Sequence, residues 1–541
     1  MVIRPRSSYR GRELLRSLAL IALGLAGAAG TCGCYSDSCA DAYLCEIPRP
    51  EPSPCDGDPE TAPALDMCGV FVSEQGDDKH PGTKDAPVKT LQHAIGLAAS
   101  GRGDGKPPTR RVYACGGTFK ETITLPSGVD LWGSRRCEAG GDWSYRWSFE
   151  GPAHSTTISP PAEIPLRVLQ GQETSTIFGV RMVAADASAK DGKSSIAMIL
   201  GPGAKAKVVS SEIVAGHGKD GEPGDDASSD RAKPGVVGHD GADACTADAA
   251  MGALQVVTLC EDGSESTGGY GGNGGIDRGG DGASGQPAPA DNSDGNGIGG
   301  IGAGSTPCKD GSDGEKGRDS GRAAGAVGPG RLGIEGWTGV RGEDGKKGGI
   351  GQGGGGGGGS KGQGDVVACR AGDPQGGAAG GSGGSGGCGG TGGMGGGYGG
   401  ASIGIIALQG SSLTVEMSEI TTGNGGRGGV GGTGQPGGYG AAFGHGGVHP
   451  YDAMWRACKG GFGGDGGRGG DAGGGAGGPS FGIASIGATV TLALDAAVNH
   501  GQGGDGGLAG NAADGDARGK GERAAQIFWK RFDAPEQGPA R

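Results

Sequence analysis

The chain has 541 residues, 133 of them glycine, and a formal net charge of −13 at pH 7. Phosphate binding requires a basic face, so this acidic balance argues against nucleic acid as a partner. Only 34% of the residues are apolar, and the glycine-rich part therefore cannot form a conventional core.

Residues 1–33 have the order of an export signal: basic residues come first, then the apolar run Leu18 to Ala29, then small residues. The apolar run is too short for a membrane-spanning helix, which needs about 20 residues. The segment resembles a bacterial lipoprotein signal, whose processed cysteine carries the lipid. Cys34 follows the small residue Gly33 and is the expected lipidation site, with Cys32 as the alternative.

This resemblance implies a lipid anchor in the bacterial cell envelope, at the outer membrane or the cell surface. Neither cysteine has the usual leucine three positions upstream, so cleavage and secretion without a lipid is the alternative. Export favours disulfides over metal ligands, and we expect no metal site and no cofactor. The proline-rich segment 34–70 predicts a tether with its own disulfides. Further along the chain, the disulfides that we expect are Cys115 with Cys137 and Cys245 with Cys260.

Ordered structure is predicted to begin with a short amphipathic helix that Asp85 can cap. The apolar face of this helix consists of Val88, Leu91, Ile95 and Ala98. Glycine and proline turn signals then separate short strands. The predicted strands are 111–115, 121–125, 129–132, 156–159, 166–169, 176–183, 196–200, 207–209 and 213–215.

The order of these elements resembles the beginning of a right-handed parallel β-helix of the pectin-lyase-like group. The resemblance lies in PVKTLQHAIGLAA, followed by VYACGGTFKETITLPSGVDLWGS. It implies that the helix caps a stack of coils over residues 71–216, in which a disulfide from Cys115 to Cys137 would clamp two adjacent coils. Ile158, Ile177 and Ile196 recur every 19 residues, a spacing that suits stacked coils. An ordinary β-sandwich is the alternative fold.

Beyond residue 216 glycine dominates the segments 217–400, 423–480 and 501–541, the last of which includes a C-terminal tail. Within 380–394, each triplet holds two glycines and one other residue. A left-handed extended helix with three residues per turn places every third residue on one edge, which leaves two edges of bare glycine. Such helices can approach closely enough to hydrogen-bond through their backbones. We therefore predict bundles of polyglycine II-like helices, with disorder as the alternative.

Two segments that resemble each other, 401–422 and 481–500, interrupt the glycine, and an earlier copy precedes residue 218. In each copy a branched apolar residue lies three places before the glycine that opens the next tract. This pattern predicts coils that send out glycine-rich arms and then resume. The layout resembles the exported glycine-rich proteins called PGRS or PE-PGRS-like, without their PE leader. The predicted fold class is all-β: a right-handed parallel β-helix with inserted polyglycine II-like arms and a short N-terminal capping helix.

Motifs of catalysis and metal binding occur without their usual context. Ser402 and Ser480 each satisfy GxSxG, yet neither opens a helical pattern, and abundant glycine makes chance matches common. The GGxGxD matches that end at Asp465 and Asp471 lack the large apolar residue of the calcium-binding repeat. We therefore expect no catalytic residue and no specific metal site.

The sequence thus predicts a non-catalytic structural or adhesive surface protein, with polysaccharide or protein of other cells or of matrix as partner. The first alternative is a β-helix polysaccharide lyase or glycoside hydrolase, which would need two carboxylates within about 5 to 10 Å of each other in a groove. Lys120, Glu121, Asp130 and Arg181 form no obvious cluster of that kind. The second alternative is a glycine-rich surface protein that binds calcium loosely.

Overall fold

The computed structural model describes residues 53–541, apart from the gaps 138–140, 147–154, 189–192, 363–368, 451–454, 514 and 534–541. The expected signal segment and the lipidation site at Cys34 or Cys32 lie outside the described residues. The chain divides into two units, Met1–Ser53 and Pro54–Arg541, and the elements below all belong to the second.

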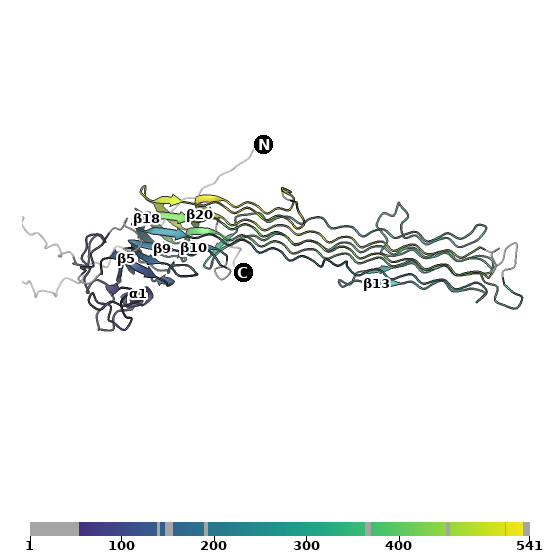
Figure 1. Ribbon diagram of the computed structural model, residues 1–541, viewed down its shortest axis with the longest axis horizontal. Coiled ribbons are helices and arrows are strands. Elements are labelled where there is room, and N and C mark those ends of the chain that lie inside the picture. Colours follow the sequence, from purple (N-terminus) through teal and green to yellow (C-terminus); the bar gives the residue numbers. More distant parts are fainter. Residues whose placement is uncertain are drawn as a thin grey trace, which may run out of the picture. The chain divides into compact units, whose positions relative to one another are not determined.

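This unit is nearly all-β, and its described residues form three parallel sheets of seven, six and six strands (Figure 1). The first sheet has the order β1 (Val70–Val72), β2 (Arg111–Cys115), β5 (Asp130–Arg135), β8 (Ser175–Phe178), β11 (Lys205–Val209), β18 (Ser412–Glu416) and β21 (Thr489–Leu492). The second has the order β4 (Ile123–Leu125), β7 (Leu166–Val168), β10 (Ser195–Leu200), β17 (Ser402–Ala407), β20 (Ser480–Ile486) and β23 (Gln526–Phe532). The third has the order β3 (Gly117–Phe119), β6 (Thr156–Ile158), β9 (Val180–Val183), β12 (Glu212–Ala215), β19 (Glu419–Thr422) and β22 (Ala497–Asn499).

From β2 onward the chain visits the first, third and second sheets in a fixed cycle. Each strand therefore pairs with the equivalent strand of the cycle before and of the cycle after. This register aligns buried side chains in columns, because equivalent positions face the same side of a parallel sheet. The column of the second sheet, for example, runs through Ile123, Leu166, Met198, Ile405 and Ile483.

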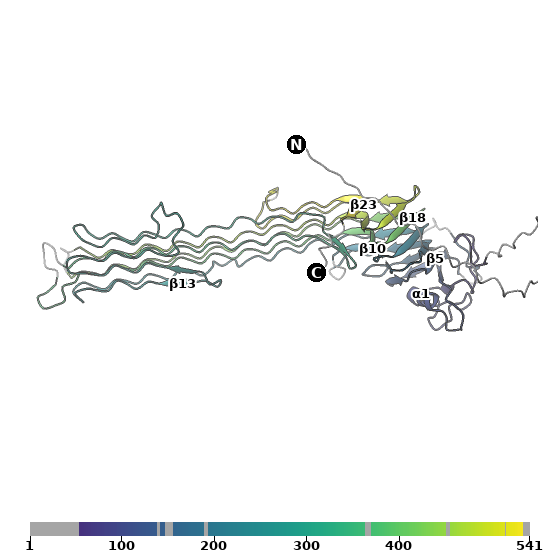
Figure 2. The ribbon, with the colours of Figure 1, turned by 180° about the vertical axis from the view of Figure 1, so that it is seen from behind.

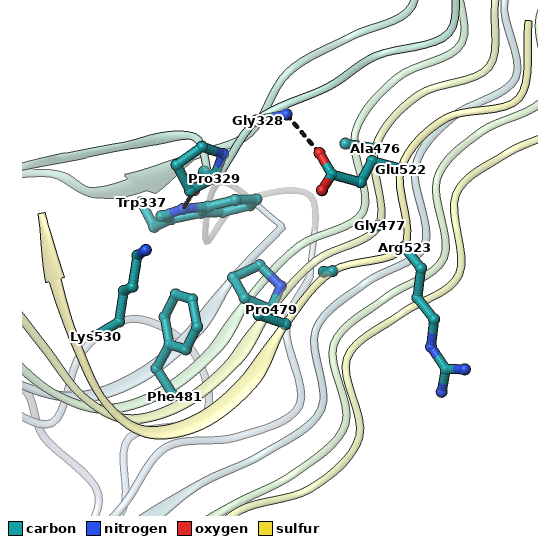
Figure 3. Close-up of a pocket in the computed structure, with 12 residues that line it drawn as sticks. Gly328, Pro329, Trp337, Ala476, Gly477, Pro479, Phe481, Glu522, Arg523 and Lys530 are labelled. Carbon is teal, nitrogen blue, oxygen red and sulfur yellow. Dashed lines mark hydrogen bonds between the residues drawn. The ribbon is translucent and has the colours of Figure 1, made fainter.

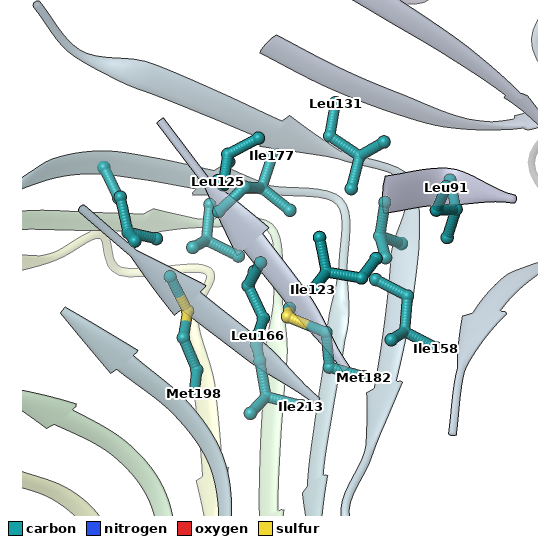
Figure 4. Packing of buried hydrophobic residues seen from close by; sticks show 14 of the residues in the cluster. Leu91, Ile123, Leu125, Leu131, Ile158, Leu166, Ile177, Met182, Met198 and Ile213 are labelled. Carbon is teal, nitrogen blue, oxygen red and sulfur yellow. The ribbon is translucent and has the colours of Figure 1, made fainter. Parts of the chain in front are cut away.

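Figure 4 shows side chains of the three sheets meeting in one interior, among them Leu131, Leu166 and Ile213. The expected stacking of Ile158, Ile177 and Ile196 is wrong, because these residues belong to the third, first and second sheets. Their equal spacing in the sequence does not reflect the cycle of strands, because loops and arms of different lengths separate successive strands.

The helix α1 (Leu91–Ser100) covers the first end of this interior with Leu91, Ala94, Ile95 and Ala98, all fully buried. Asp85 is not its cap, which corrects our expectation. The helix begins later, after Thr90, whose side chain makes no capping hydrogen bond. Instead the Glu121 carboxylate accepts the N–H groups of Leu91 and Gln92 at 2.8 and 3.0 Å, which satisfies two of the donors that a helix start leaves unpaired.

Three glycine-rich excursions, which we call arms, leave the sheets. Residues 216–401 connect β12 to β17, residues 423–479 connect β19 to β20, and residues 500–525 connect β22 to β23. Figures 1 and 2 show their segments running side by side from the same side of the sheets. The first arm also contains two antiparallel hairpins, β13 (Val257–Leu259) with β14 (Glu265–Thr267) and β15 (Arg331–Gly333) with β16 (Gly336–Thr338).

Residues 54–70, expected as part of the tether, belong instead to the compact unit, where Ala62, Ala64 and Cys68 pack in one apolar cluster with residues of the first sheet. The guanidinium of Arg135 donates to the carbonyl of Pro59 at 2.7 Å and lies 5.5 Å from the ring centres of Tyr113 and Trp132. Burial lowers the pKa of Arg135 to about 10. Facing rings of this kind stabilise a cation that has few hydrogen-bond partners.

Candidate functional site: the glycine bundle and the pocket at its base

Each pair of neighbouring arm segments is joined by a backbone hydrogen bond at every third residue, and the residues between these bond to other segments. The N–H groups of Gly348 and Gly351 donate to the carbonyls of Gly390 and Gly387 at 2.8 and 2.9 Å. Gly387 in turn donates to a different segment, at Gly464. A repeat of three matches an extended helix with three residues per turn, in which residues i and i+3 share one edge.

The run Gly353–Gly359 lies in the middle of the bundle. Its N–H groups donate to three neighbouring segments and its carbonyls accept from three others. These six segments are represented by Gly269, Gln286, Gly300, Ser312, Gly384 and Gly461. A Cβ atom added at Gly354 would overlap the backbone of Gly461. Because every edge of the run touches another backbone, none of its seven positions has space for a side chain.

The segment 380–393 is also hydrogen-bonded on all three edges, since Ser382 and Ser385 donate their N–H groups to His239 and Val236. Along 380–393 two edges are glycine, and the third edge carries small side chains. Ser382 and Ser385 on that edge are fully buried, and their hydroxyls accept the N–H groups of His239 and Val236 at 2.8 and 2.7 Å. A segment can thus be packed on every edge and still carry one small, buried side chain per triplet.

Aspartates at the rim of the bundle act as hydrogen-bond acceptors for the next segment. Asp226 accepts the backbone N–H and the hydroxyl of Thr433, which lowers the pKa of Asp226. The two aspartates of the GGxGxD matches do the same, since Asp465 and Asp471 accept the N–H groups of Gly440 and Gly434. Within the described residues, no group of three or more His, Cys, Asp or Glu is arranged to hold a metal ion.

Three disulfides staple the arms, and they pair Cys245 with Cys369, Cys260 with Cys388, and Cys308 with Cys458. The expected pair Cys245–Cys260 is therefore wrong. The returning segment near residue 376 lies beside Cys245, whose N–H donates to Gly376, so each cysteine bonds across the bundle rather than along the chain.

Near the sheets, Cys115 is bonded to Cys137, the pair proposed from the sequence. Since Cys115 ends β2 and Cys137 follows β5, this disulfide joins two neighbouring strands of the first sheet. Cys55 is bonded to Cys68, within the segment predicted as a stapled tether.

The GxSxG serines are structural. Ser402 and Ser480 are fully buried and pair with each other in the second sheet. Their hydroxyls donate to the carbonyls of Gly216 and Gly423, where the first and second arms leave, at 2.7 and 2.9 Å. Each serine therefore links the returning end of an arm to a departing end, and its hydroxyl is not accessible to a substrate.

The outer face of the third sheet brings together Arg181, Glu212 and Glu419, which are register neighbours. Both carboxylates already have partners: Arg181 Nε lies 2.7 Å from Glu212 Oε2, and Asn499 Nδ2 donates to Glu419 at 2.7 Å. Register neighbours of this kind were not recognised from the sequence, because 207 residues separate Glu212 from Glu419.

The other charged residues considered for catalysis do not join this row. Glu121 caps α1, as described above. Asp130 accepts the N–H of Thr176 at 2.8 Å, and burial raises the pKa of Asp130. These positions indicate roles in holding the fold.

A pocket of about 240 Å³ lies where the arms meet the second sheet (Figure 3). Three segments far apart in the sequence line it: the β15–β16 hairpin, the start of β20, and the stretch from 522 to β23. Trp337 and Pro329 form one wall, and Pro479 and Phe481 form the facing wall. The indole N–H of Trp337 donates to the Pro329 carbonyl at 2.9 Å and fixes the orientation of the ring. Sequence reasoning did not identify this pocket, because no single segment contains it.

Comparisons with protein-family models, with curated proteins and with solved structures give no match to this chain. Within the part of the chain that the structure describes, no helix combines the length and apolar character needed to cross a bilayer.

Proposed function

We propose that the protein is a non-catalytic structural surface protein, in which a parallel β-helix supports a rigid bundle of polyglycine II-like arms. The observation that carries this proposal is the continuous backbone hydrogen bonding of the arms. A surface made of tightly packed backbone, with side chains only at its rim, suits presentation or adhesion better than chemistry.

The fixed cycle of the chain through three parallel sheets supports the β-helix, as do the apolar columns and the helix that covers their first end. The right-handed sense comes from the resemblance to the pectin-lyase-like group. The arms leave between the third and second sheets in successive cycles, so each coil places its arm beside the previous one. This arrangement explains how glycine-rich segments of nearly uniform sequence can assemble into one bundle.

The energetics indicate why the arms carry disulfides. Ordering glycine costs about 0.5–1 kcal/mol more per residue than ordering alanine, while each backbone hydrogen bond contributes about 0.5–1.5 kcal/mol net. These terms are similar in size, and the bundle has few buried apolar side chains to add to them. A disulfide contributes about 2–4 kcal/mol. A bundle whose stability depends on disulfides suits an oxidising compartment, and this supports export. Together with the lipoprotein-like start of the sequence, it supports anchorage in the bacterial envelope.

Hydrogen exchange followed by mass spectrometry tests the proposal. We expect amides of Gly380–Gly396 in the mature, oxidised protein to exchange nearly as slowly as those of β17 and β18. Reduction of the disulfides should accelerate exchange in the arms and leave the strands nearly unchanged. Fast exchange of the arms under oxidising conditions, with slow exchange in the strands, would make them a flexible brush and refute the rigid bundle.

A further inference from the structure

We propose that the last strands of the three sheets form an interface with a second copy of this chain. These strands are β21, β22 and β23, and we call the surface that they form the open end. The inference goes beyond the proposed function and does not depend on the rigidity of the arms. It rests on the contrast between the two ends of the stacked sheets, on the unpaired strand edges of the open end, and on the charges of its strands.

The opposite end of the stack is closed by α1 and by side chains that pair with the outer strand edges (Figure 1). Gln92 of α1 accepts the N–H of Thr124 in β4 at 2.7 Å and donates to the carbonyl of the same residue at 3.3 Å. Glu74 accepts the N–H of Thr118 in β3 at 2.8 Å. Val88 exchanges backbone hydrogen bonds with the segment of β1. All three sheets therefore find partners for their outer edge at this end without another chain.

At the open end, apolar side chains of the interior are only partly covered. Those of Val490, Leu492, Val498 and Trp529 pack against the core but remain partly exposed. Their register partners one cycle earlier are fully buried, and these are Leu413, Val415, Ile420 and Ile483. Phe528 of β23 is 52% exposed. Within the described residues, the last cycle thus lacks the cover that a following cycle gives to each earlier one.

The strands of the open end also have backbone groups free for pairing, since each is the last strand of its sheet among the described residues. In the first sheet, the N–H groups of Thr489 and Ala493 donate to carbonyls next to and within β18. Successive residues of a strand direct their backbone groups to opposite sides. The N–H and C=O groups of Val490 and Leu492 therefore point to the open edge. Such an edge is a template for another strand.

The open end carries few of the charges that usually protect exposed edges. Neither β21 nor β22 contains a charged residue or a proline, and the charged residues of β23 are Lys530 and Arg531. Natural edge strands avoid pairing through charges, proline or bulges. A single strand of another protein would pair with one of the three edges, whereas a second open end pairs with all of them at once. This match favours a second copy over a different partner.

A twofold axis across the stack brings two open ends together with the facing strands antiparallel. One strand then faces its own copy, and the other two face each other. The first place suits β23, because pairing centred on Trp529 sets Lys530 opposite the partner's Phe528. An ammonium group beside an aromatic ring is favourable, whereas like charges directly opposite each other are destabilising. The other end is covered by α1, so association stops at two copies.

The test is sedimentation velocity of the mature, oxidised chain over a range of concentrations, with Cys34→Ala to exclude association through a lipid. We expect an equilibrium between monomer and dimer. Phe528→Lys should weaken the dimer at least about tenfold, because it places a second ammonium group opposite the partner's Lys530.

Phe462→Lys is the matched control. Phe462 is 47% exposed, nearly as much as Phe528, but lies in the second arm. This change should therefore alter the dissociation constant of the dimer less than about twofold. Both phenylalanines are about half exposed, so neither change should prevent folding.

Hydrogen exchange locates the interface. Amides of β21 and β22 should exchange more slowly in the concentrated dimer than in the diluted monomer, and amides of β3 and β4 at the closed end should exchange equally in both. Rapid exchange in the arms alone would refute the rigid bundle and leave the dimer unaffected.

The proposal would be overturned by a monomer that persists at about 100 μM, by equal losses in the two variants, by a dimer without slower exchange in β21 and β22, or by oligomers that keep growing with concentration. A monomer whose open end is already protected, and loses this protection when residues 534–541 are removed, would assign the cover to the chain's own segment and exclude the second copy.

Discussion

Substituting alanine for glycine in the centre of the bundle should destabilise it, although the same change at its rim should not. Gly356 lies in the central run, and an added Cβ would overlap the carbonyl of Tyr270. The neighbouring segments must then move apart. Overpacking of this kind costs about 1–3 kcal/mol, and loss of one or two backbone hydrogen bonds adds about 1 kcal/mol each. We therefore expect Gly356→Ala to lower the free energy of opening of the arms by about 2–5 kcal/mol.

Gly321→Ala is the matched control, because a Cβ at Gly321 meets no atom within 4 Å and its φ is not in the left-handed region. Alanine there should stabilise the arm by about 0.4–1 kcal/mol, since it restricts the unfolded chain. Hydrogen exchange of the oxidised protein measures both changes. Since 1.4 kcal/mol is a factor of ten, Gly356→Ala should accelerate arm exchange about thirtyfold or more, whereas Gly321→Ala should slow it. Equal effects of the two substitutions would refute the close-packed bundle.

Three further predictions concern the disulfides of the arms, the aspartates at the rim of the bundle and the expected lipid anchor. Replacing Cys260 and Cys388 together by serine should lower the stability of the arms by about 2–4 kcal/mol. Hydrogen exchange should then be faster around the β13–β14 hairpin. Peptide mapping of the native chain without reduction should recover the Cys260–Cys388 disulfide. Because hydrogen bonds from Thr433 lower the pKa of Asp226 below its ordinary value, the stability that Asp226 contributes is fully present above that ordinary value and is lost as the pH falls through the folded pKa. Asp226→Asn should therefore lower the melting temperature at pH 7, and this difference from the native chain should shrink as the pH falls through the folded pKa of Asp226. Metabolic labelling with palmitate should disappear in Cys34→Ala and persist in Cys32→Ala, and labelling that survives only in Cys34→Ala would reassign the lipid.

The strands of the stacked sheets could be predicted because short apolar runs alternate with turn residues. The run 111–115 was predicted with the bounds of β2. The predicted strand 176–183 is instead divided into β8 and β9 at Gly179, whose φ of 62° turns the chain from the first sheet into the third. Sequence periodicity cannot locate such a corner, because the apolar residues on both sides continue the same run.

The glycine triplets likewise predicted an extended helix with three residues per turn. Two edges of such a helix carry only glycine, and close packing of neighbouring backbones explains why they carry no side chains. Contacts over long distances could not be predicted. The disulfide partner of Cys245 depends on which segment returns beside it, and β23 lies in a region expected as a tail because its apolar residues form a single isolated run. The pocket depends on the β15–β16 hairpin, which lies more than 100 residues before the other two segments and meets them only after the arms have assembled.

The stacked sheets solve a problem of register that the glycine arms cannot solve alone. Identical triplets can slip past one another by three residues at little cost, because the pairing of uniform, glycine-rich segments is weakly specified. The apolar columns do not allow such a slip. Ile213 of β12 pairs with Ile420 of β19, and the same separation of 207 residues continues into the arms, where Asp220 accepts the N–H of Arg427. The strands therefore set the register in which the arms begin, and the disulfides hold it further along.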